Sequence, residues 1–181
     1  MDFIKTIAKI KDAPEISIAR LLVLLQTFEG PSSKPLKGLT KLAKIDFLLR
    51  YPVYLERALE AIESDSSKVK VTPVERNTIE SKMIRYKYGP WDPKHRNLVN
   101  LMVARGFVTV DKTPATSIKL TEDGFTAAQE MMKQPEFEDI TRRAKLLKSK
   151  FNKSGTWLKN FIYETFPEIL TLQYREEIEY E

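Results

Sequence analysis

Residues 81–121, SKMIRYKYGPWDPKHRNLVNLMVARGFVTVDKTPATSIKLT, decide the fold that we expect of this chain. The segment YGPWDP at 88–93 is rich in glycine and proline, which predicts a turn, and Asp92 is placed to cap the helix that follows. Residues 94–105 (KHRNLVNLMVAR) predict an amphipathic helix, because apolar residues fall at positions i, i+3 and i+4 of one inward face: Leu98, Leu101 and Met102. Gly106 is expected to end this helix.

Two short apolar segments follow the helix and are separated by polar residues. Residues 107–110 (FVTV) predict one strand, residues 118–120 (IKL) predict a second, and residues 111–117 (DKTPATS) predict the loop of a hairpin. Thr121 and Asp123 are placed to start another helix. A helix, a strand, a polar loop, a strand and a helix in this order are typical of a winged-helix unit, in which the hairpin loop is the wing.

The remaining chain is predicted to be mostly helical. Apolar spacing favours helices over residues 15–28, 39–49, 53–62, 123–133, 137–151 and 157–166. The first of these carries the densest apolar stripe, which predicts the central helix of the core. Thr40 and Thr156 are placed to cap two of the helices, and residues 30–37 and 63–70 are expected to be loops. The predicted fold class is mainly α with a small β-hairpin, a winged-helix core with additional C-terminal helices.

The chain is expected to form one domain with extensions. We divide it into an N-terminal arm or short helix at residues 1–12, a winged-helix domain at 13–133 and a C-terminal helical extension at 134–181. Within the domain, residues 74–85 fit either a short helix or an extended segment. The extension ends in an acidic tail that contains Glu176, Glu177, Glu179 and Glu181.

Residue types that carry catalysis are scarce. The chain has no cysteine and one histidine, His95, which excludes disulfides, thiolate metal sites and cysteine nucleophiles. No Gly-x-Ser-x-Gly motif occurs, and the loop GPSSK at 30–34 lacks the Gly-Lys-Ser/Thr ending of a phosphate-binding loop. Glu80 and Lys82, with Asp65 upstream, match groups used by some metal-dependent nucleases, but they are not predicted to lie on adjacent strands. We therefore expect a protein that is not an enzyme and that has no catalytic, cofactor-binding or metal site.

Hydropathy gives an expectation about location. No apolar run approaches the roughly 20 residues that a bilayer span requires. The first residues, MDFIKTIAKIKD, lack the long apolar core of a signal peptide. We expect a soluble, cytoplasmic protein that does not contact membranes.

Positive charge exceeds negative charge along the chain. The formal net charge of +5 and the isoelectric point of about 9.2 permit contact with nucleic acid. Basic residues gather in the central stretch and in a later helix, and these are the candidate DNA contacts: Arg85, Lys87, Lys94, His95, Arg96, Arg105, Lys112, Arg142, Arg143 and Lys145. Such residues can hold phosphates, and a helix that begins with Lys94, His95 and Arg96 can also read bases. A solvated charged face is the alternative to both.

Three aromatic residues are candidates for a protein interface: Trp91, Trp157 and Phe161. Trp157 and Phe161 belong to an aromatic stripe on the last predicted helix, and this stripe is large for so short a terminal helix. The stripe either closes the core or presents a surface to a partner, because interface energy concentrates in a few aromatic residues.

A series of segments occurs in a recognisable order along residues 13–170. They are APEISIARLLVLLQTFEG, LTKLAKIDFLLRYP, the YGPW turn, NLVNLMVARGFVTV, TSIKLTEDG, FEDI and WLKNFIYETFPE. Together they resemble the middle component of bacterial ABC-three-component systems, the family that includes the small subunit of Lamassu-type anti-phage and anti-plasmid defence.

The resemblance implies a non-catalytic, winged-helix adaptor. Its implied partners are an ABC ATPase similar to chromosome-maintenance and double-strand-break-repair coiled-coil proteins, a separate effector such as a nuclease, and DNA bound through the complex. The ATPase would sense DNA, the effector would damage it and the adaptor would couple the two. The alternative function is a winged-helix transcriptional regulator that binds DNA through Lys94, His95, Arg96 and the wing.

Overall fold

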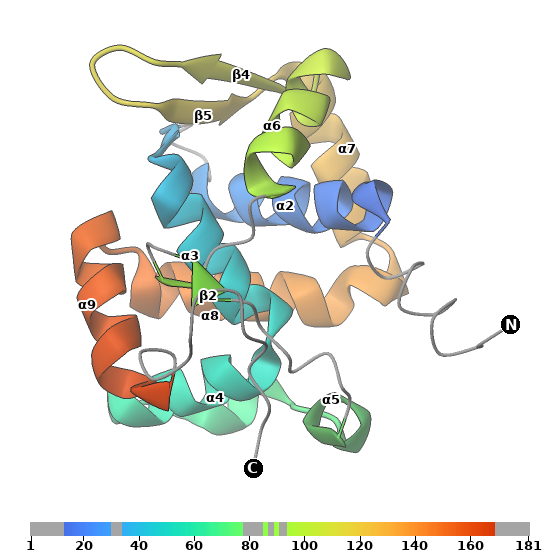
Figure 1. Cartoon of the computed structure of the whole chain (residues 1–181). Helices are drawn as coiled ribbons and strands as arrows, with labels where there is room; N and C mark the ends of the chain where they lie inside the picture. The colour runs from blue at the N-terminus through green and yellow to red at the C-terminus, as the bar shows by residue number, and fades with distance from the viewer. Residues whose placement is uncertain (1–12, 30–33, 78–84, 87–88, 91–93, 169–181) are drawn as a thin grey trace, which may run out of the picture.

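A computed structural model describes residues 13–29, 34–77, 85–86, 89–90 and 94–168 (Figure 1). The first part contains α2 (Pro14–Glu29), β1 (Leu36–Lys37), α3 (Leu39–Arg50), α4 (Pro52–Ala61), the 3-10 helix η2 (Ser66–Val69) and α5 (Pro73–Asn77). The second part contains β2 (Arg85–Tyr86), β3 (Gly89–Pro90), α6 (Lys94–Ala104), β4 (Val108–Asp111), β5 (Ser117–Leu120), α7 (Glu122–Met132), the 3-10 helix η4 (Pro135–Phe137), α8 (Glu138–Phe151) and α9 (Gly155–Thr165). The predicted fold class, mainly α with a small β-hairpin, is confirmed. The predicted arm at residues 1–12 and the acidic tail lie outside the described residues.

The predicted hairpin gains a third strand. Strands β4 and β5 pair antiparallel, with Val108 opposite Leu120, and β1 adds to the free edge of β5, with Leu36 opposite Ile118. Buried residues alternate with exposed ones along β5, as the pleat requires. The prediction of a loop over residues 30–37 was therefore wrong for its last two residues. A strand of two residues is too short to show the alternation of apolar and polar residues that predicts a strand.

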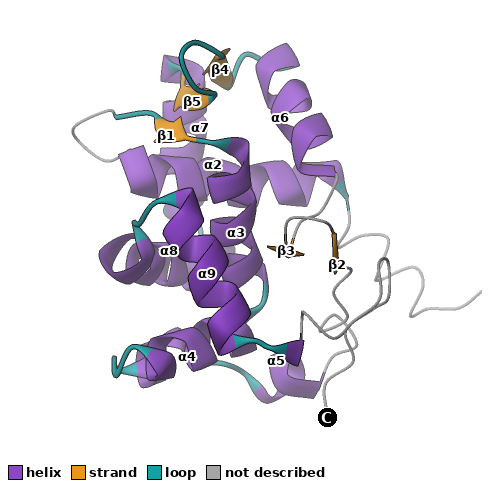
Figure 2. Cartoon of the chain, turned by 60° about the vertical axis from the view of Figure 1, so that its left-hand side comes forward, coloured by secondary structure: helices purple, strands orange, loops and turns teal. Residues whose placement is uncertain are grey.

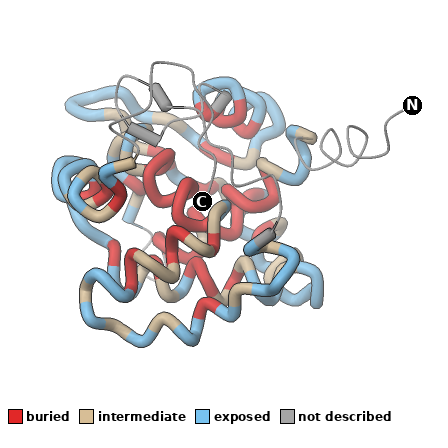
Figure 3. The backbone as a smooth tube through the Cα atoms, turned by 60° about the horizontal axis from the view of Figure 1, so that its bottom comes forward, coloured by how far each residue is buried: buried red, intermediate tan, exposed pale blue. Residues whose placement is uncertain are grey.

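The core forms around α2, as its apolar density predicts. Residues 18–25 of this helix are all buried, so it is surrounded on every side rather than on one face. Figure 2 shows α2 between the sheet end of the molecule and the layer of α3, α8 and α9. The buried parts of the tube gather in the centre of Figure 3, and exposed parts lie outside. Buried residues of α8 and α9 belong to the same core cluster as those of α2 and α3, including Leu147, Phe151 and Ile162.

Three local predictions were wrong in position. On α6, Leu98 and Met102 face the core as expected, but Leu101 is exposed and Val99 is buried in its place. The caps of α3 and α9 are Gly38 and Ser154 rather than the threonines two residues further on. Residues 66–69 of the expected loop form η2, whose Val69 is fully buried.

The start of α7 depends on a glycine. Thr121 caps α7, as predicted, by accepting a hydrogen bond from the backbone N–H of Gly124 at 3.1 Å. A Cβ atom at position 124 would lie 1.9 Å from the carbonyl oxygen of Phe107 and 2.8 Å from its carbonyl carbon. Glycine is therefore required where α7 crosses the end of α6 and the start of β4.

Candidate functional site

The single histidine lies inside the protein rather than on a DNA-facing surface. Nε2 of His95 lies 2.9 Å from Oδ2 of Asp46, and Arg20 donates to the same carboxylate from Nε at 2.7 Å and from Nη2 at 3.2 Å. The exposed fractions are 4% for His95, 1% for Asp46 and 8% for Arg20. The interpretation of His95 as a DNA contact is corrected on this ground: its ring joins α6 to α3.

Arg20, Asp46 and His95 form a buried triad, and electrostatic interactions explain why the charge of Asp46 is stable inside the protein. Burial opposes ionisation of Asp46, but the charge of Arg20 and the hydrogen bonds from His95 and Arg20 hold its pKa well below the usual range. The carboxylate is therefore ionised and accepts bonds from α2 and α6 at once. The polar groups of the triad are occupied by one another, and its role in this arrangement is to fix three helices together.

The exposed face of α6 and the loop between β4 and β5 carry the remaining central candidates. Arg96 is exposed, and so is Lys112 in the loop between β4 and β5. Arg105 is exposed and donates from Nη2 to Oε1 of Glu15 at 3.0 Å, across to the start of α2. Lys87 and Trp91 lie outside the described residues, as do the side chains of Arg85 and Lys94.

Arg143 is the second candidate that the structure removes from the surface. It is 4% exposed, donates to the carbonyl oxygens of Val69 and Lys70 at 3.0 and 3.1 Å, and pairs with Glu75 at 2.7 Å. Burial of Glu75 opposes its ionisation, but hydrogen bonds from Arg143 and the backbone of Thr72 lower the pKa of its carboxyl group. Arg143 thus holds η2 and α5 against α8. The prediction that it contacts DNA is corrected, because its guanidinium is used inside the protein.

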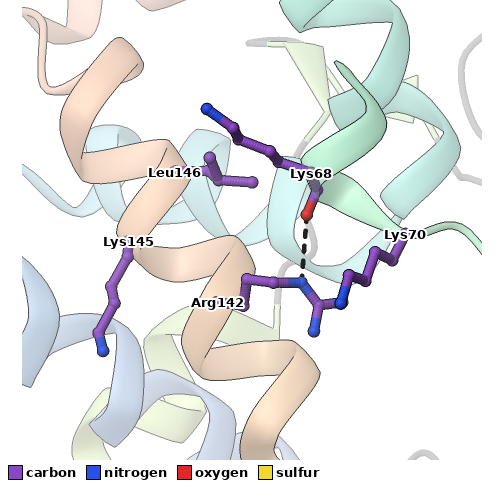
Figure 4. A pocket seen from close by; sticks show the side chains of 5 residues that line it. All are labelled: Lys68, Lys70, Arg142, Lys145 and Leu146. Carbon is purple, nitrogen blue, oxygen red and sulfur yellow. Dashed lines mark hydrogen bonds between the residues drawn. The ribbon is translucent and has the colours of Figure 1, made fainter. Parts of the chain in front are cut away.

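Arg142 and Lys145 lie beside a surface depression that we call the basic hollow (Figure 4). It has a volume of about 310 Å³ and is lined by Lys68, Lys70, Arg142, Lys145 and Leu146. Four of these five residues have long side chains, whose methylene stems can cover a surface beside their charged ends.

The charged groups around the basic hollow are not equivalent. The guanidinium of Arg142 already has partners within the protein. It donates to the carbonyl oxygens of Lys68 and Val69 and pairs with Asp139 at 2.5 Å. Lys68 lies 3.6 Å from Asp65, in an exposed and weak pair. Lys145 is exposed, and Figure 4 shows its ammonium group turned away from Arg142.

Sequence reasoning missed the contribution of η2 to this surface. Lys68 and Lys70 lie more than 70 positions before Arg142 in the chain, and the hydrogen bond from Arg142 to Lys68 spans 74 residues. The one local signal was Val69, an apolar residue between two lysines that a solvated loop does not need. No pattern in the sequence pairs that segment with α8.

The two aromatic candidates on α9 are stacked on each other, and one of them is exposed. The rings of Trp157 and Phe161 are nearly parallel, with an angle of 8° and centroids 4.9 Å apart. Trp157 is 37% exposed, and Phe161 is half-buried against the ring of Phe151, which is fully buried. The stripe therefore helps to close the core, through the contact of Phe161 with Phe151 of α8, and it leaves Trp157 at the surface.

The acidic residues that the structure describes are spread apart rather than gathered as metal ligands. Within residues 13–29, 34–77, 85–86, 89–90 and 94–168, no three His, Asp or Glu side chains gather in a way that would hold a metal ion. Asp65 caps η2 by accepting from the backbone N–H of Ser67 at 3.0 Å. Glu80 and Lys82, the other members of the nuclease-like set, lie outside the described residues.

Comparisons with known proteins add no relatives. No family model matches the sequence, and neither the curated proteins nor the solved structures contain a match. Among the helices that the structure describes, none combines the length and the apolar character needed to cross a bilayer.

Proposed function

We propose that the chain is a non-catalytic adaptor subunit in a bacterial, cytoplasmic defence complex. In this complex it couples a DNA-sensing ABC ATPase, similar to chromosome-maintenance proteins, to a separate effector such as a nuclease. The resemblance of residues 13–170 to middle components of ABC-three-component systems supports the proposal. The type of domain is a winged helix, supported by the succession α2, β1, α3, α6, β4, β5 and by the sheet order β1-β5-β4.

The observation that carries the DNA-related part is the basic hollow. Lysines from η2 and from α8 meet on one surface although their segments are distant in sequence. Phosphate contacts of this kind add affinity and orientation without reading sequence, which suits a subunit that steadies DNA presented by a partner.

A DNA-binding regulator is the second candidate, favoured by exposed Arg96 on α6 and Lys112 in the wing. The buried position of His95 removes one of the three residues that such a reader would use at the start of its helix. The remaining exposed residues suit phosphate contacts at least as well as base contacts.

The experiment is co-purification from the native gene neighbourhood. The chain, carrying an affinity tag, is expressed together with the genes on either side, and the purified complex is assayed for ATP hydrolysis. We expect a stoichiometric partner with a Gly-x-x-x-x-Gly-Lys-Ser/Thr motif and a DNA-stimulated ATPase activity.

The opposite outcomes are equally specific. Purification of the chain without an ATPase, from cells that express all neighbouring genes, would overturn the adaptor. Tight and sequence-specific DNA binding by the isolated chain as a dimer would favour the regulator instead.

A further inference from the structure

Lysines from α3 contact the turn between α8 and α9, just before the exposed Trp157 in the chain. Nζ of Lys41 donates to Oδ1 of Asn152 at 2.9 Å, and Nζ of Lys44 donates to the carbonyl oxygen of Gly155 at 2.9 Å. Both contacts lie within the five residues that precede Trp157. We call this place, with its exposed lysines Lys150 and Lys153, the tryptophan ledge.

Negative charge is missing from the chain around the ledge. Residues 140–163 contain seven lysines or arginines and no aspartate or glutamate. Burial lowers the pKa of Lys41, and burial together with repulsion from Lys159 lowers the pKa of Lys44 to about 8. Lys44 and Lys159 repel each other, and a bound anion relieves such repulsion.

The indole of Trp157 is stacked on an aromatic neighbour, and the residue is partly exposed. Phe161 stacks on it at 4.9 Å, and Phe161 in turn contacts buried Phe151 at 5.4 Å. A ring held by two aromatic neighbours loses little further freedom when a ligand stacks on it. Trp157 as a whole residue is 37% exposed, which leaves part of it accessible to a ligand.

We propose that the tryptophan ledge binds an unpaired nucleotide of single-stranded DNA. The base stacks on Trp157, and the adjoining phosphates lie near Lys150 and Lys153. Aromatic stacking combined with a positive surface is the chemistry of single-strand binding, and a base inside a duplex cannot offer its face to an indole. The inference rests on the proposed function, because it names the form of DNA that the adaptor would hold. It also assigns Trp157 to DNA rather than to the protein interface for which it was a candidate.

The test uses the full-length chain, free of partners, in a Trp91→Phe background. The chain has two tryptophans, so Trp157 is then the sole indole fluorophore. The probes are an oligodeoxythymidylate of roughly 12 nucleotides, an abasic strand of the same length and a duplex. We expect fluorescence quenching by the first probe alone, and affinity for it at least about fivefold higher than for the abasic strand, as expected for one stacked base.

Two variants separate stacking from charge. Trp157→Ala should bind the base-containing and abasic strands equally, whereas Lys150→Gln/Lys153→Gln should weaken binding of both strands and flatten the dependence on salt. Phe125→Ala and Lys133→Gln are the matched controls, since both residues lie on or beside α7, away from α9, and should bind like the parent. If Trp157→Ala does not fold, judged by its thermal melting, Trp157→Leu takes its place.

Two outcomes would overturn the inference. One is equal affinity of the parent for the base-containing and abasic strands; the other is unchanged single-strand binding in Trp157→Ala. If that variant instead loses the ATPase subunit and keeps its oligonucleotide affinity, Trp157 is a protein interface and the adaptor proposal survives. If no ATPase partner exists, the oligonucleotide measurements still show whether the tryptophan ledge binds single-stranded DNA.

Discussion

Nε2 of His95 lies 2.9 Å from the carboxylate of Asp46, which ties the first turn of α6 to the middle of α3. The same carboxylate receives Arg20 from α2, so one buried side chain holds three helices. Helix α6, which precedes β4, is thereby fixed to the core by a buried hydrogen bond as well as by apolar contacts.

Removing the charge of Asp46 should destabilise the protein strongly. In Asp46→Asn, the guanidinium of Arg20 stays buried without its counter-charge, and breaking one partner of a buried pair costs about 3–5 kcal/mol. Urea unfolding followed by circular dichroism measures the change. Arg96→Ala on the exposed face of α6 is the control and should shift stability by less than about 0.5 kcal/mol. A decrease below about 1 kcal/mol in Asp46→Asn would contradict a structural role for the triad.

The triad also predicts a dependence of stability on acid. Because the pKa of Asp46 is lowered on folding, its stabilisation is fully present above its unfolded pKa, near 3.8, and is lost as pH falls toward the folded value. The parent should therefore lose more free energy of unfolding between about pH 5 and pH 3 than Asp46→Asn does. The lowered pKa of Glu75 contributes equally to both proteins and cancels in the comparison. Urea unfolding at a series of pH values measures both curves, and parallel curves for parent and variant would contradict the prediction.

Two glycines should respond in opposite ways to the same substitution. Gly124→Ala places a methyl group on the backbone of Phe107 and should cost about 1–3 kcal/mol, since backbone cannot move aside as a side chain does. Gly155→Ala at the first position of α9 meets only Lys41 Cβ, at 3.9 Å, and should be neutral or stabilise by up to about 1 kcal/mol. Thermal melting of both variants tests the pair. Equal effects would show that α7 shifts freely away from Phe107.

The basic hollow predicts a change in salt dependence rather than in specificity. In the whole complex, Lys68→Gln/Lys145→Gln should reduce the slope of log affinity against log salt by about 0.9 for each phosphate that the variant no longer neutralises. The effect should be the same for unrelated duplex sequences, because phosphates carry no sequence information. Lys37→Gln on β1 is the control, since this exposed lysine lies at the sheet end of the molecule. An unchanged slope in the double variant would show that these lysines are solvated and do not contact phosphates.

Sequence alone determined the helices and most of the inward faces. Apolar periodicity placed α2, α3, α7 and α8 within a few residues of their observed bounds, and the helix with the densest apolar stripe, α2, is the buried centre of the core. The same reasoning placed the hairpin and the capping Thr121, because turn and cap signals are local. Such features depend on residues a few positions apart, and a single sequence records those spacings directly.

Only the tertiary structure decided what the polar residues do. His95 and Arg143 looked like surface cations, but each is buried by a partner far away in sequence: Asp46 at 49 positions and Glu75 at 68. A polar or charged side chain is stable inside a protein when a partner pairs with it, and its neighbours in the sequence do not reveal a distant partner. The same limit hid the basic hollow, where η2 and α8 meet, and the tryptophan ledge, where α3 reaches α9. Local spacing fixes which faces are apolar, whereas long-range packing fixes which charges remain free to bind.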